Sequence, residues 1–185
     1  LKGAEAASEK LQSNLTKAAT IATAAFAGLA GTITGLIGTY KIQEQAEIKL
    51  ETTLRSTGHA AGLTKDELLE MASSLQKVTT FGDETIISAQ SLLLTFTKIG
   101  RDVFPQAIET ILDMSQHLGQ DLKSSAIMLG KALNDPVAGI TALQRVGVNL
   151  SEEQKKLIKS FAGVNDVASA QKVILGELTT QFGGQ

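Results

Sequence analysis

The chain has 185 residues, enough for one domain of ordinary size and an extension. Its 17 basic and 19 acidic residues give a formal net charge of −2, which argues against a strongly basic, nucleic-acid-binding domain. It has no cysteine and two histidines that lie far apart, which excludes a disulfide framework and argues against a structural zinc site.

The first 60 residues predict one long helix that is rich in alanine and glycine. No proline interrupts residues 4–55, and charged residues lie at both ends of this stretch. A helix of about 50 residues is roughly 75 Å long. Glycines at 58 and 62 end it, so we expect a first domain at residues 1–60 and a second, compact one at 61–185.

Two stripes with the 3.5-residue period of coiled coils run along this helix. The first contains Leu11, Leu15, Ala18, Ala22, Ala25, Leu29, Thr32 and Leu36. The second consists mostly of small residues, and we predict it to be a self-association face: Ile21, Ala24, Gly28, Gly31, Gly35 and Gly38. Each glycine inside a helix costs about 1 kcal/mol relative to alanine, and close approach of another helix would offset that cost.

No charge interrupts residues 18–40, and three interpretations of this run stay open. It could associate with copies of itself, dock on the rest of the protein, or span a membrane, since 23 residues are long enough. Six bulky apolar residues contribute only about 2–4 kcal/mol to insertion. We therefore expect self-association and no insertion as a lone span in the resting state.

Residues 61–185 predict about seven short helices with clear start and stop signals. Thr64-x-x-Glu67 and Ser151-x-x-Gln154 fit capping boxes, and Pro105 suits a first helical turn. The last helix begins after Asn165 or Asp166. The expected helices cover residues 64–78, 82–100, 105–119, 121–133, 136–147, 151–163 and 166–182.

Apolar residues recur at helical spacing through all of these segments. Examples of expected core residues are Leu68, Met71, Leu75, Val78, Ile108, Ile111, Leu112 and Met114. The fold class is therefore all-α, with a long N-terminal helix of coiled-coil spacing followed by a compact bundle of about seven short helices.

Catalytic, cofactor and metal sites are not predicted. Glu109 and Asp113 lie four residues apart on one helix face, but solvated carboxylates at that spacing are common on surfaces. His117 lies near a helix end, where it suits the helix dipole, and His59 lies in a glycine-flanked loop that we expect to be exposed. The glycines at 28–38 follow no strand, which excludes a dinucleotide-binding loop.

Three long segments closely resemble the phage tail tape measure proteins. They are LQKVTTFGDETIISAQSLLLTFTKIGRDVF at 75–104, GKALNDPVAGITALQRVGV at 130–148 and SEEQKKLIKSFAGVNDVASAQKVILGEL at 151–178. The Ala/Thr/Gly helix at the front also resembles what precedes this domain in the family. The resemblance covers most of the chain, and we expect the chain to be a segment of a longer polypeptide.

The resemblance implies a structural role in the virion. Such proteins form an extended helical homo-oligomer in the tail lumen, set tail length, contact the tail tube, tail tip and tail assembly chaperone proteins, and leave the tail during DNA ejection. It further implies assembly in the host cytoplasm, transient contact with the host envelope and no sequence-specific nucleic acid. An alternative is a membrane-active helical protein that forms a channel for DNA, and a less favoured one is an enzyme domain.

Overall fold

The computed structural model describes residues 41–184 and divides the chain into two units, Leu1–Ile42 and Gln43–Gln185. The second unit confirms the all-α prediction, because no strand occurs in the described residues. Residues 41–56 are helical, and the seven expected short helices follow. Their bounds are α2 Lys65–Gln76, α3 Asp83–Leu93, α4 Phe104–Leu118, α5 Leu122–Asn134, α6 Pro136–Gln144, α7 Glu152–Gly163 and α8 Val167–Phe182. The predicted long helix before residue 41 lies outside the described residues.

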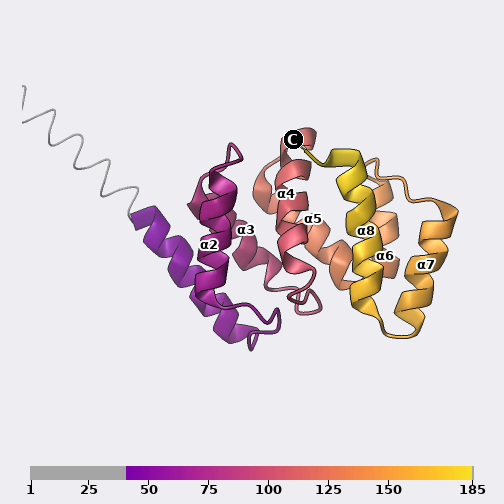
Figure 1. The fold of residues 1–185 in the computed structure, drawn as a ribbon, viewed down its shortest axis with the longest axis horizontal. Helices are drawn as coiled ribbons and strands as arrows, with labels where there is room; N and C mark the ends of the chain where they lie inside the picture. Colours follow the sequence, from indigo (N-terminus) through magenta and orange to yellow (C-terminus); the bar gives the residue numbers. More distant parts are fainter. Residues whose placement is uncertain (1–40, 185) are drawn as a thin grey trace, which may run out of the picture. The chain divides into compact units, whose positions relative to one another are not determined.

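Helices in the second unit pack mainly on neighbours in the chain (Figure 1). α2 packs on α3, α3 on α5, α4 on α5, and α5 on α6, while α7 and α8 form a final pair. The contact of α4 with α8 joins the middle of the unit to this last pair. One continuous apolar core, mostly of leucine, isoleucine and alanine, results from this sequential packing.

The helix at residues 41–56 contributes to this core. Ala46, Leu50 and Leu54 are spaced four residues apart, which puts them on one helix face, and all three are buried. The Lys65 ammonium at the start of α2 lies 3.5 Å from the Glu47 carboxylate and 3.4 Å from that of Glu51. The compact unit therefore begins at Gln43 and includes residues of the segment that the sequence assigned to the long helix.

Both capping boxes form as predicted. The Thr64 hydroxyl accepts a hydrogen bond from the Glu67 N–H, and the Glu67 carboxylate accepts one from the Thr64 N–H at 2.9 Å. Ser151 and Gln154 exchange the same pair of bonds at the start of α7. Asp166, the second of the two expected caps, begins α8. These bonds satisfy backbone donors that a helix start leaves without partners.

Glu67 also connects α2 to the loop before α4. The Arg101 guanidinium binds the Glu67 carboxylate and donates to the Gly62 carbonyl at 2.7 Å. Hydrogen bonds from the Thr64 N–H, from Arg101 and from the Thr64 hydroxyl lower the pKa of Glu67 from 4.5 to about 2. The ionised carboxylate is thus the form that the folded chain prefers.

Two expectations about this region were wrong. The helix expected at 82–100 ends at Leu93, because the chain turns there to bury Ile99 and to place the Phe96 ring against Gly130 of α5. Val78, expected in the core, is 76% exposed. α2 ends at Gln76, so Val78 follows the helix and no longer obeys its period.

Two glycines of the α5–α6 hairpin permit unusually close packing. A Cβ at Gly130 would lie 2.3 Å from Phe96 ring atoms. A Cβ at Gly139 would lie 2.5 Å from the Ala132 carbonyl oxygen and 2.6 Å from the Ala132 Cα. The second contact is with backbone, which cannot rotate away as a side chain can, so α6 approaches α5 only because residue 139 is glycine.

Buried glutamines hold the core at two further points, which the sequence did not predict. The Gln171 side chain on α8 donates to the carbonyls of Lys98 at 2.9 Å and Leu133 at 2.8 Å. The Gln90 side chain on α3 donates to the Leu68 carbonyl at 3.0 Å. Lys98 lies in the loop between α3 and α4, Leu133 near the end of α5 and Leu68 within α2. Each glutamine side chain therefore fixes its own helix to a neighbouring element.

We predict that Gly139→Ala destabilises the chain by about 1–3 kcal/mol, because the added methyl group overlaps the Ala132 backbone. Gly176→Ala is the matched control, since a Cβ at this exposed α8 position meets nothing within 4 Å. It should raise stability by up to about 1 kcal/mol through helix propensity. Urea unfolding followed by circular dichroism measures both, and equal effects of the two changes would contradict the close approach.

We predict that Glu67→Gln removes a pH-dependent part of the stability. A carboxylate with a lowered pKa stabilises the folded state above the unfolded pKa near 4.5, and this stabilisation is lost as pH falls toward about 2. The difference between wild type and variant should therefore be largest above pH 5 and vanish near pH 2. Urea unfolding over this range tests it, with Glu70→Gln on the exposed side of α2 as control. A difference that does not change with pH would refute the role of the charge.

Candidate functional surface

The six residues of the predicted self-association face lie outside the described residues, as does the uncharged run at 18–40. The face consists of Ile21, Ala24, Gly28, Gly31, Gly35 and Gly38. What the structure does describe is the helix at 41–56, into which the spacing of both stripes continues.

The two stripes have opposite environments in this helix. Continuing the first stripe beyond Leu36 at alternating steps of three and four reaches exposed Gln43, then Ala46 and Leu50, which are buried in the compact unit, and half-buried Thr53. Continuing the small-residue stripe reaches four exposed positions, Ile42, Gln45, Lys49 and Thr52. Three of these four residues are polar, so an apolar contact along the second stripe could not extend beyond residue 42.

Within residues 41–184, no helix is both long and apolar enough to cross a membrane. The run at 18–40 is not among these residues, so this result bears only on the compact unit.

The residues considered for chemistry do not form one site in the structure: both histidines and Glu109 are exposed, Asp113 is half-buried, and Glu109 and Asp113 line the same pocket. His59 is exposed in its loop, as expected, and His117 in the last turn of α4 packs edge-on against the Phe182 ring, with centroids 5.0 Å apart. Glu109 is exposed on α4, one turn before Asp113. In the described part of the chain, no group of three acidic or histidine side chains could hold a metal ion.

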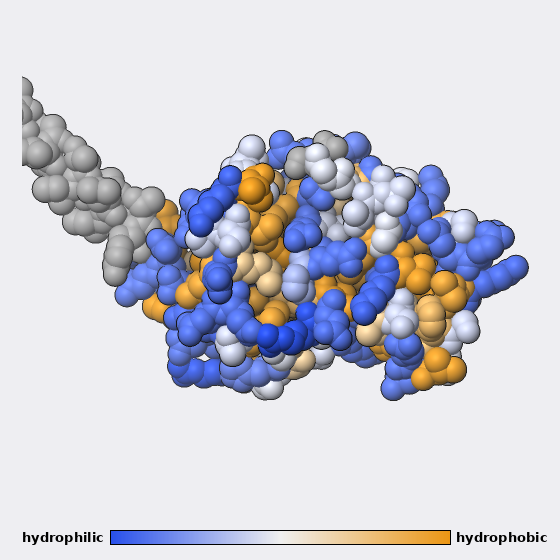
Figure 2. Space-filling model, in the orientation of Figure 1, coloured by the Kyte–Doolittle hydropathy of each residue, from blue (hydrophilic) through white to orange (hydrophobic). Residues whose placement is uncertain are grey.

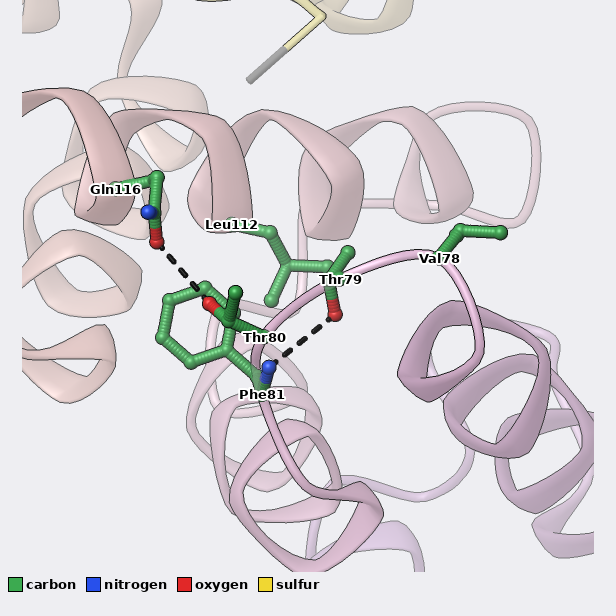
Figure 3. A pocket seen from close by; sticks show the side chains of 6 residues that line it. All are labelled: Val78, Thr79, Thr80, Phe81, Leu112 and Gln116. Carbon is green, nitrogen blue, oxygen red and sulfur yellow. Dashed lines mark hydrogen bonds between the residues drawn. The ribbon is translucent and has the colours of Figure 1, made fainter.

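A groove lies between the α2–α3 loop and α4, and we call it the α4 groove (Figure 3). It consists of two adjoining pockets of 290 and 240 Å³, which share Val78, Thr79 and Leu112. The remaining lining residues are Leu75, Thr80, Phe81, Glu109, Asp113 and Gln116. The groove is thus apolar at its centre and acidic on one side.

Hydrogen bonds hold the loop that forms one wall of the groove. The Thr80 hydroxyl donates to the Gln116 side-chain oxygen on α4 at 3.2 Å, and the Phe81 N–H donates to the Thr79 hydroxyl (Figure 3). The Thr79 hydroxyl in turn donates to the Leu75 carbonyl at the end of α2. The wall is therefore tied at both ends, while Val78 stays exposed. Helical periodicity could not find this groove, because it assigned Val78 to the core.

Comparison with known proteins gives one match. A family model described as prophage tail length tape measure protein matches residues 1–159. The match extends from the first residue into α7, so it includes both the N-terminal segment and most of the compact unit. Neither a curated protein nor a solved structure matches the chain.

Proposed function

The chain belongs to the prophage tail length tape measure protein family, and on that premise we propose that it forms part of the ruler that sets the length of a phage tail. Membership gives the chain a structural role in the phage tail and a place in the tail of the virion. The family is one of structural tail proteins and is not a known enzyme family. The family match is the observation that carries the proposal.

Residues 1–60 would supply length in this ruler. A helix extends by 1.5 Å per residue and has no proline to bend it here, so chain length converts directly into distance. The net charge of −2 suits a protein that shares a narrow lumen with DNA without binding it tightly. Contacts with the tail tube, tail tip and assembly chaperone proteins would follow from the same role.

Copies of the chain would associate through the small-residue stripe at 21–38. The first stripe is the less suitable face near its end, because its spacing leads to Ala46 and Leu50 in the core of the compact unit. On the other side, the positions that continue the small-residue stripe are polar after Ile42, although Ile48 beside them is 58% exposed. The proposed contact between copies therefore ends where the compact unit begins.

Release of the tape measure during DNA ejection would uncover the apolar residues at 18–40. One copy gains little from a bilayer, since its bulky residues are few, but several copies together would present a larger apolar surface. Contact with the host envelope is thus proposed for the assembled, released form.

We predict that tail length responds to the length of the N-terminal helix. Deleting residues 4–17 removes two heptads, preserves the phase of both stripes and leaves the small-residue stripe intact. At 1.5 Å per residue, tails should become shorter by about 20 Å in electron micrographs of phage that carry the deletion. A control phage, in which two unrelated helical heptads of equal length replace residues 4–17, should keep the original tail length. Deletion phage with tails of unchanged length would contradict the ruler role of this segment.

A further inference from the structure

We propose that the α4 groove binds the N-terminal segment at residues 10–18 of a second copy of this chain. Leucines of the segment pack against Val78 and Leu112 of the groove, and its lysines pair with Glu109. The inference goes beyond the proposed function and does not depend on it. It rests on an apolar, acidic groove in the compact unit and on an apolar, basic face in the sequence of the segment.

Charge and apolar surface define what the groove can accept. Its lining contains Glu109 and Asp113 but no lysine or arginine, and Lys77 lies outside it. Glu109 is exposed, and none of the salt bridges found in residues 41–184 involves it. Asp113 has interactions within its own copy and adds a second negative charge. The groove therefore suits a helix that carries apolar side chains along one edge of its contact face and cations along the other.

The apolar part of the groove is open, and its wall is already fixed. Val78 is 76% exposed, and Figure 2 shows apolar surface between α2 and α4. Hydrogen bonds of Thr79 and Thr80 hold the loop to the end of α2 and to α4. A partner that covers Val78 therefore buries apolar surface without first having to order the loop.

The segment at residues 10–18 carries the matching pattern in the helix that we predict for it. Successive residues of a helix are about 100° apart, so six residues of the segment share an arc of about 160°. Around the helix, this face consists of Leu15, Leu11, Ala18, Asn14, Lys10 and Lys17. Its two leucines lie at one edge and its two lysines at the other. Glu5 and Glu9, the only acidic residues in the first 43, fall on the opposite side of the helix.

The length of the predicted helix favours a second copy over the same chain as the source of the segment. Leu11 precedes Lys41, the first described residue, by 30 positions, and 30 helical residues extend about 45 Å. A straight helix would carry Leu11 out of reach of the groove of its own chain. The contact joins unlike surfaces, so it can repeat from copy to copy. A contact of one helix with one groove belongs to the small, weak class of interfaces.

Cysteine cross-linking tests the contact directly, because the chain has no cysteine of its own. Full-length Val78→Cys is mixed with a larger, tagged chain that carries Asn14→Cys, a change within the face that keeps its leucines and lysines. Mild oxidation should give the mixed disulfide dimer in several-fold higher yield than with Thr16→Cys in the tagged chain. Thr16 is the matched control, since it is two positions away in the sequence but on the opposite side of the predicted helix.

Charge reversal gives the proposal its specificity test. Lys10→Glu with Lys17→Glu in the tagged chain, or Glu109→Lys in the other chain, should each reduce the mixed dimer to the Thr16→Cys yield, and combining them should restore it. Circular dichroism of each variant checks that the fold is intact. Equal yields from Asn14→Cys and Thr16→Cys, or a yield that the charge changes leave unaltered, would overturn the proposal.

A chain that carries both Val78→Cys and Asn14→Cys distinguishes a second copy from the same chain. Oxidation of this variant should give disulfide-linked dimers and larger species whose yield rises with protein concentration. A disulfide within one chain, formed in a yield that does not depend on protein concentration, would overturn the assignment to a second copy.

Discussion

Burial of Leu50 and Leu54 sets the boundary between the segment that is proposed to bind other copies and the compact unit. These side chains fix one face of the helix at 41–56 to the compact unit, and Lys65 reinforces the contact by binding Glu47 and Glu51. A helix face that is covered in this way cannot also bind another copy. The exposed positions of the same helix are mostly polar, so the compact unit begins where apolar contacts between copies would end.

The rest of the unit depends on close contacts between neighbouring helices. Gly139 lets the α6 backbone reach that of α5, and Gly130 accepts the Phe96 ring. Gln171 then ties α8 to both the Lys98 loop and the end of α5. These contacts link the helices around one apolar core, and no strand occurs in the described residues.

Signals between residues close in the sequence predicted most of the helices. Features that depend on contacts between distant residues were not predicted. The capping boxes at Thr64 and Ser151 were found because a cap and its partner lie three residues apart. The end of α3 was missed because it depends on Phe96 meeting Gly130, which lies 34 positions later. Val78 was misplaced because its helix ends two residues earlier, and the groove beside it was missed for the same reason. The self-association face came from period alone and stays a prediction.

The central claim is that copies meet through the small-residue stripe, and sedimentation of the full chain tests it most directly. Gly31→Leu with Gly35→Leu should abolish the oligomer while leaving the helical content intact or higher, because leucine is the better helix former. Ala22→Leu with Ala25→Leu makes the same kind of change on the first stripe and should leave the oligomer in place. An oligomer of unchanged mass with leucine at both glycine positions, or its loss only in the alanine variant, would contradict the account.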